Sequence, residues 1–207
     1  WGATAVLAGT TSDDRMSAAE ELSRSTGAVI VPPYDNLAIM AGQATCGLEI
    51  LADQSSAMTV VVPVGGGGLS GGISTIVKLV RPAARVIVVE PEGAAKLSAA
   101  WRAGAPVRID GAESAADGLL AVKIGARNFA HLHRYADEVV TVTESEIAEA
   151  AAYLFRELKL VAEPSGATAL AALLTGKVRP SGETIAVLSG GNIAMDALRA
   201  FTADHLR

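Results

Sequence analysis

The sequence contains a single cysteine, Cys46, among 207 residues, and aromatic side chains make up only 4% of it. One thiol excludes a framework of disulfide bonds within the chain and fits a reducing cytoplasm. Its neighbours, Thr45 and Gly47, offer no partner for thiol chemistry. We therefore expect Cys46 to be a small buried core residue without a functional role.

Long hydrophobic runs and blocks of like charge are also absent. No apolar run has the length needed to cross a bilayer, and the first residues lack the basic-then-apolar order of a signal peptide. The 17 Lys and Arg residues and the 22 Asp and Glu residues are interspersed and leave a net charge of -5. This composition argues against a membrane or a nucleic acid as the partner.

Half of the residues are hydrophobic, and apolar runs typical of buried strands alternate with helical patterns. We expect strands at 3–8, 28–31, 58–64, 85–90, 138–142 and 184–188. We expect one helix between the N-cap candidates at 11–14 and Gly27, and others at 37–52, 69–80, 94–103, 119–132, 144–158, 164–174 and 193–203. Residues 106–118 are predicted to be a loop. This alternation predicts an α/β fold with a parallel sheet and helices on both faces.

Four consecutive glycines, Gly65–Gly68, follow the apolar run of residues 58–64 and precede a predicted helix. Without Cβ atoms this segment, the glycine loop, can bring several backbone N–H groups close to an anion at the positive end of the helix dipole. A flexible linker is a poor alternative, because linkers are rare between two apolar segments of one α/β unit. The loop therefore predicts a phosphate site.

The local pattern leaves the phosphate compound open. No Gly-Lys-Ser or Gly-Lys-Thr follows, and Lys78 lies inside the predicted helix, so a nucleoside-triphosphate loop is excluded. Gly66, Gly68 and Gly71 have the spacing of a dinucleotide-binding motif, and Glu90 ends the next strand where a ribose-binding acid would lie. A nicotinamide-dependent dehydrogenase therefore stays open on this evidence.

Six stretches in order resemble one family over essentially the whole chain. They are AGQATCGLEI (41–50), VPVGGGGLSGGI (62–73), VVEPEGA (88–94), AADGLLAVKIG (115–125), AEPSGATALAAL (162–173) and LSGGN (188–192). They resemble fold-type II pyridoxal-phosphate enzymes, of the branch that contains threonine dehydratase and serine racemase. The resemblance implies a fold like that of the tryptophan synthase β subunit, here without its N-terminal part.

The resemblance also implies the residues that contact pyridoxal 5'-phosphate: Gly65, Gly66, Gly67, Gly68, Leu69, Gly118, Glu163, Ser189 and Asn192. The first five would hold the phosphate through backbone N–H groups. Ser189 would bind the pyridine nitrogen, and a hydroxyl at that place makes the ring a weaker electron sink than a carboxylate would, which suits β-elimination. For Glu163 an ordinary role as an acid at a helix N-terminus is equally open.

The cation site of the family is incomplete in this sequence. Relatives that hold a divalent cation use a glutamate, a backbone carbonyl and an aspartate; Glu90 and Ala94 match the first two, but Lys96 stands at the aspartate position, and an ammonium cannot ligate a cation. His131 and His133 are two positions apart and would point in different directions on a helix. We therefore expect no metal site.

Two motifs of the family are not found. The lysine that forms a Schiff base with the cofactor precedes the glycine loop in relatives, whereas the five lysines here all follow it. The S-x-G-N-H substrate loop is not found either. We therefore expect a fragment: residues 1–36 as a strand-helix-strand remnant of the small domain, and 37–207 as the large cofactor-binding domain.

The resemblance implies a parent enzyme that is a cytoplasmic threonine or serine dehydratase, an ammonia-lyase that releases a 2-oxo acid and ammonia, and is a homodimer at full length. The chain alone is expected to bind phosphate without turnover. A serine or threonine racemase, a nicotinamide dehydrogenase and a non-catalytic phosphate-binding module remain as alternatives. The choice between threonine and serine depends largely on the substrate loop.

Overall fold

A computed structural model describes residues 2–9, 12–54 and 58–205 of the chain. By its internal contacts the chain divides into two compact units, Trp1–Pro33 and Tyr34–Arg207. The division falls in the Pro-Pro-Tyr-Asp-Asn turn, close to the predicted boundary between 36 and 37. All the residues expected to bind the cofactor belong to the second unit.

The first unit contains helix α1 (Ser12–Thr26), as the sequence predicted, and Gly27 follows it with a φ of 73°. The strands predicted at 3–8 and 28–31 were wrong for the described structure, which assigns no strand to residues 2–9 or 27–33. A strand requires a hydrogen-bonded neighbour, and the described part of this unit offers none. Leu7 and Val29 are correspondingly exposed.

The second unit is built on a four-stranded sheet in the order β3-β2-β1-β4, in which every pair is parallel. The strands are β1 (Met58–Pro63), β2 (Arg85–Pro91), β3 (Glu138–Val142) and β4 (Glu183–Ala186). Every residue of β1 is buried. This agrees with the unbroken apolar pattern of the segment, since a central parallel strand is covered on both faces.

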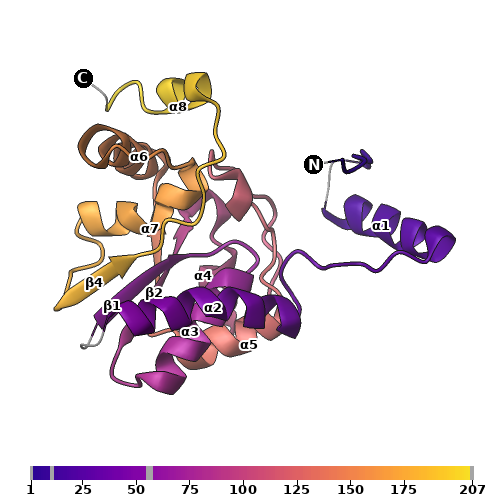
Figure 1. The fold of residues 1–207 in the computed structure, drawn as a ribbon, viewed down its shortest axis with the longest axis horizontal. Coiled ribbons are helices and arrows are strands. Elements are labelled where there is room, and N and C mark those ends of the chain that lie inside the picture. The colour runs from indigo at the N-terminus through magenta and orange to yellow at the C-terminus, as the bar shows by residue number, and fades with distance from the viewer. Residues whose placement is uncertain (1, 10–11, 55–57, 206–207) are drawn as a thin grey trace. The chain divides into compact units, whose positions relative to one another are not determined.

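Helices cover both faces of this sheet (Figure 1). Val60, Val62 and Val86 pack with Ile73 and Val77 on the face covered by α2 (Leu37–Asp53) and α3 (Gly68–Val80). The same face continues through Val88 to α4 (Lys96–Ala103) and α5 (Ala126–Tyr135). The opposite face, with Val61, Ile87 and Val89, packs against α6 (Glu144–Leu158) and α7 (Pro164–Leu174). The predicted fold class is confirmed.

The remaining elements are short. They are the 3-10 turns η1 (Glu92–Ala94) and η2 (Asp117–Leu119) and the final helix α8 (Met195–Phe201). The helix predicted at 119–132 begins only at Ala126, because residues before it pair with the preceding loop: Arg108 and Lys123 form an antiparallel bridge, and Ile109 N–H donates to Val122 O. Among the described residues no helix is long and apolar enough to cross a membrane.

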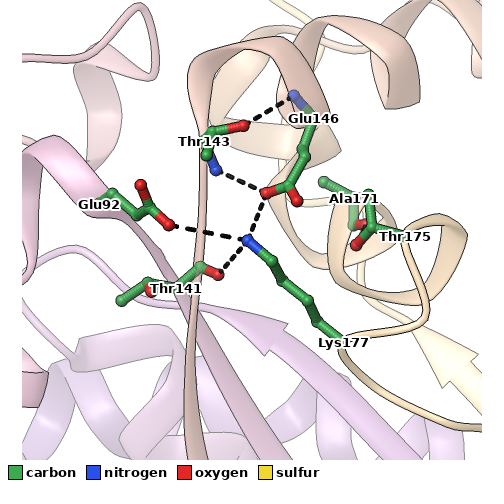
Figure 2. A network of polar contacts seen from close by, with 7 residues as sticks. All are labelled: Glu92, Thr141, Thr143, Glu146, Ala171, Thr175 and Lys177. Carbon is green, nitrogen blue, oxygen red and sulfur yellow. Dashed lines mark hydrogen bonds and ion pairs between the residues drawn. The ribbon is translucent and has the colours of Figure 1, made fainter.

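A polar network fixes the start of α6 (Figure 2). Thr143 and Glu146 form a capping box, in which the Thr143 hydroxyl accepts from Glu146 N–H and the Glu146 carboxylate accepts from Thr143 N–H. Lys177 Nζ donates to Glu146 Oε2 at 2.7 Å and to Thr141 O at 3.1 Å, and lies 3.7 Å from Glu92 Oε1. These contacts tie the end of β3 to the segment that follows α7.

Candidate functional site

The strand order places a topological switch point between β1 and β4. From β1 the chain crosses through α3 to β2 on one side, whereas β4 pairs with β1 on the other side. Loops that leave the carboxyl ends of two such strands diverge and open a crevice, which is where α/β proteins bind ligands. The glycine loop follows β1 here, and the LSGGN segment follows β4.

The glycine loop ends in an uncapped helix. Gly67 is the N-cap residue of α3, with a φ of 96°, and provides no side chain to the helix. Among the described residues no acceptor contacts the N–H groups of Gly68, Leu69 or Ser70. Three free N–H groups at the positive end of a helix form an anion site. The structure therefore gives the glycine loop the geometry that a phosphate requires.

Close packing explains why this loop needs glycine. A Cβ on Gly65 would lie 2.8 Å from Gly118 O, and a Cβ on Gly67 would lie 2.8 Å from Asn128 Cβ. A Cβ on Gly66 would collide with the ring of Tyr34. Tyr34 was missed in the sequence analysis, because only the tertiary fold brings its ring onto the loop. The loop is thus enclosed on several sides by other parts of the second unit.

Gly118 lies directly beside the glycine loop. Its N–H donates to Asp117 Oδ1 at 2.8 Å and to Ser165 Oγ at 3.0 Å. Ser165 is buried at the start of α7 and was not singled out from the sequence, although it stands inside the EPSGA stretch. It links the segment around Gly118 to the helix that carries Glu163 at its N-cap.

Glu163 holds the loop that follows β4. Its Oε2 accepts from Asn192 N–H at 3.0 Å, and its own N–H donates to Gly190 O at 3.1 Å. Both Ser189 and Asn192 are exposed in that loop. The structure therefore brings Glu163, Ser189 and Asn192 into one loop cluster, and Glu163 acts on it through backbone contacts. Direct contacts of these three residues with a cofactor stay predictions.

The residues at the family's cation position do not fit a metal ion. Glu90 and Lys96 are both fully buried, and Lys96 Nζ lies 3.4 Å from Glu90 Oε2. Burial lowers the pKa of Lys96, and the neighbouring Glu90 carboxylate opposes this shift. Among the described residues no group of three acidic, histidine or cysteine side chains could hold a metal.

The buried position of Glu90 also argues against a nicotinamide site. Its carboxylate accepts from Leu97 N–H at 2.9 Å and from Ser98 N–H at 2.7 Å, in addition to the contact with Lys96. A fully buried carboxylate with these partners is not available to a ribose hydroxyl. The dinucleotide spacing of Gly66, Gly68 and Gly71 is therefore not accompanied by the acidic residue that the motif needs.

A family model described as "Pyridoxal-phosphate dependent enzyme" matches residues 1–190. The chain belongs to this family. It is 40% identical to an L-threonine ammonia-lyase of Thermotoga maritima over 198 residues, which are 95% of this chain and 49% of the relative. It is 34% identical to the catabolic L-threonine dehydratase of Escherichia coli K12 over 205 residues, 98% of this chain and 62% of the relative.

Two solved structures show the same fold. A threonine deaminase of the organism abbreviated T.th. has a TM-score of 0.89 at 37% identity, over 94% of this chain and 65% of that one. A serine racemase from Dictyostelium discoideum has a TM-score of 0.83 at 31% identity, over 94% of this chain and 63% of the racemase chain. The family and fold expected from the sequence are confirmed. The chain spans about half the length of the first-named relative.

Proposed function

We propose that the protein is a pyridoxal-phosphate-dependent ammonia-lyase for threonine or serine and that these 207 residues supply most of its cofactor site. The observation that carries the proposal is the uncapped N-terminus of α3 at the switch point, in a chain 40% identical to an L-threonine ammonia-lyase. The shape and the free N–H groups of the glycine loop suit a phosphate. The relatives supply the reaction class.

The glycine loop and Leu69 would hold the phosphate through backbone N–H groups. Gly118, held by Ser165, would border the site on one side, and the loop with Ser189 and Asn192, held by Glu163, on the other. The exposed Ser189 would offer a hydroxyl to the pyridine nitrogen. The segment around Gly118 and the loop after β4 are both hydrogen-bonded to residues at the start of α7, so this helix would position both borders of the site.

Pyridoxal phosphate, when bound, supplies the electron sink that acidifies the Cα–H of an amino acid and permits loss of a β-hydroxyl. The residues of this chain would bind the cofactor and orient it. The Ser189 hydroxyl, in place of a carboxylate, would leave the pyridine nitrogen largely without a proton, which favours elimination over reactions that need a long-lived carbanion. Tyr34 would exclude water from the side of Gly66 on which its ring lies.

None of the five lysines is placed to attach the cofactor. Lys96 is buried with its ammonium bound, Lys78 pairs with Asp137 at 2.8 Å, and Lys177 belongs to the network of α6. Lys123 is exposed beside the Arg108 bridge, and Lys159 is the C-cap of α6. We therefore expect the 207-residue chain to bind the cofactor without turnover.

The test uses the protein as its gene encodes it, alongside the 207-residue chain. Pyridoxal phosphate binding is followed by absorbance, attachment to lysine by borohydride reduction and mass spectrometry, and turnover by release of 2-oxo acid from threonine and from serine. We expect binding by both proteins, but attachment and turnover only by the longer one. NADH binding, or turnover by the 207-residue chain, would contradict the proposal.

Racemisation is the second candidate, because a serine racemase superposes with a TM-score of 0.83. A chiral assay on serine separates the two reactions in the same samples. D-serine formed faster than 2-oxo acid would assign the protein to the racemases. We expect the 2-oxo acid to dominate, since the threonine ammonia-lyase of Thermotoga maritima is 40% identical and the racemase 31%.

A further inference from the structure

Lys96 is the largest fully buried side chain of the described structure, and it ends in an ionisable amine. It is the first residue of α4, and its Nζ donates to Val64 O at 2.7 Å and to Leu119 O at 3.1 Å. The third neighbour is Glu90 Oε2 at 3.4 Å. A buried ammonium is tolerated only when its three donors have partners, and the structure provides three oxygens.

These oxygens come from three separate elements. Val64 immediately precedes the glycine loop, Leu119 immediately follows Gly118, and Glu90 lies near the end of β2. The Glu90 carboxylate is itself fixed by the N–H groups of Leu97 and Ser98. The ammonium therefore joins the base of the glycine loop to the segment that carries Gly118.

The two joined segments touch directly beside this ammonium. A Cβ on Gly65 would lie 2.8 Å from Gly118 O and 3.3 Å from Leu119 Cα, so their backbones approach as closely as two glycines permit. Such an approach brings the carbonyl dipoles of the two segments together. Lys96 Nζ binds one carbonyl of each segment, Val64 O and Leu119 O, and its positive charge offsets their repulsion. One carboxylate and two backbone carbonyls are also the ligands that a hard metal cation uses.

We propose that the Lys96 ammonium is a built-in cation, which holds the glycine loop against the Gly118 segment and makes this site independent of a metal ion. Lys96 is then a positioning residue for the phosphate loop. Its consequence for the cofactor depends on the proposed function, whereas its consequence for metal dependence does not. The ammonium has no exposed surface and all its donors are used, which separates this role from attachment to a cofactor.

The experiment compares wild type, Lys96→Met and Lys96→Asp in the protein as its gene encodes it, each with EDTA or with CaCl2. Melting temperature is measured without cofactor, and pyridoxal phosphate affinity is measured separately. We expect the wild-type melting temperature to be the same in both solutions. Lys96→Met should melt roughly 10 °C lower in both, since Glu90 loses its buried partner.

Lys96→Asp should show a new dependence on calcium, because two carboxylates and two carbonyls then face one another without an ammonium. We expect its melting temperature to rise on addition of CaCl2, and its cofactor affinity to recover with it. Lys96→Met has only one carboxylate and should respond to CaCl2 in neither measurement. A calcium-stabilised wild type, or a folded Lys96→Asp protein indifferent to calcium, would overturn the proposal.

Lys78→Met is the matched control. Lys78 Nζ also contacts one carboxylate and two carbonyls, those of Asp137, Pro82 and Ala84, but these lie near the amino end of β2, whereas Lys96 lies near its carboxyl end. Its loss should lower the melting temperature without weakening the cofactor affinity. Equal cofactor affinity in Lys96→Met and wild type would refute the positioning role. Failure of wild type to bind the cofactor would refute the proposed function instead, and the calcium measurements would still decide the role of Lys96.

Discussion

The backbone N–H of Gly118 donates a hydrogen bond to the hydroxyl of Ser165 across 3.0 Å. The two residues lie 47 positions apart in the sequence. This bond joins the segment beside the glycine loop to the first turn of α7, and the same turn begins at Glu163, which holds the loop after β4. One helix start therefore connects both borders of the proposed cofactor site.

Replacing Ser165 by alanine should loosen this connection. The Gly118 N–H would keep only Asp117 as its partner, and the loss of a hydrogen bond at a buried hydroxyl costs about 1–3 kcal/mol. We expect a lower free energy of unfolding in urea and a weaker affinity for pyridoxal phosphate. Ser145→Ala, at an exposed serine in α6, is the control and should change neither. Unchanged cofactor affinity in Ser165→Ala would show that the bond does not shape the site.

Gly67→Ala should damage the glycine loop through packing. Gly67 and Gly104 both have a positive φ, 96° and 68°, so alanine is strained by about 1–2 kcal/mol at either position. At Gly67 the added Cβ would also meet Asn128 and Ile124 at 2.8 Å, which adds about 1–3 kcal/mol of overpacking, whereas Gly104 has open space. We expect Gly104→Ala to retain cofactor binding and Gly67→Ala to lose it, as measured by absorbance titration. Similar cofactor affinities for the two variants would contradict this account.

Glu163→Ala should release the loop that carries Ser189. The carboxylate accepts from Asn192 N–H, and a hydrogen bond to a charged group contributes about 1.5–3 kcal/mol. We expect weaker cofactor binding and faster amide exchange at Asn192 by mass spectrometry. Glu163→Gln keeps an acceptor oxygen and should restore part of both. A role in direct cofactor contact alone would leave the exchange rate of Asn192 unchanged.

Glu146 makes stability depend on pH in the acidic range. Burial raises the pKa of this carboxyl, but hydrogen bonds from Lys177 and Thr143 together outweigh burial, so that its native pKa lies below the usual value of 4.5. A carboxyl with a depressed native pKa stabilises the fold above its unfolded pKa, and this contribution is lost as pH falls through the native pKa. Glu146→Gln should therefore lower the melting temperature at pH 7, and the difference from wild type should shrink below about pH 4. Glu149→Gln, on the same helix at an exposed position, is the control for the loss of one carboxylate and should leave the melting temperature at pH 7 nearly unchanged.

Much of the second unit could be predicted from the sequence. The predicted ranges 138–142, 144–158 and 164–174 coincide with β3, α6 and α7. Each depends on local signals: an apolar run for β3, the Thr143 capping box for α6, and Pro164 at the first position of α7. The glycine loop was predicted for the same reason, since its composition and its place between strand and helix already indicate a close approach to an anion.

Other features could not be predicted because their partners are distant in the sequence. Besides the pairing of the preceding residues with the loop at 108–109, Asp35 stabilises the start of α5, since its carboxylate accepts from Ala126 N–H at 3.1 Å and from Arg127 N–H at 2.9 Å across 91 and 92 positions. The strands expected at 3–8 and 28–31 fail for the same reason, since apolar composition does not supply a neighbouring strand. Local propensity contains no information on such pairings.

The sequence by itself determined the family and the order of helices and strands in the second unit, and it predicts a phosphate site at residues 65–68, because each follows from residues adjacent in the chain. Only the tertiary structure decided how Ser165 supports Gly118, how Glu163 holds the loop after β4, and that the Lys96 ammonium lies among three oxygens. The reason is physical: hydrogen bonds and ion pairs act over a few ångströms, and only folding brings these residues within that range.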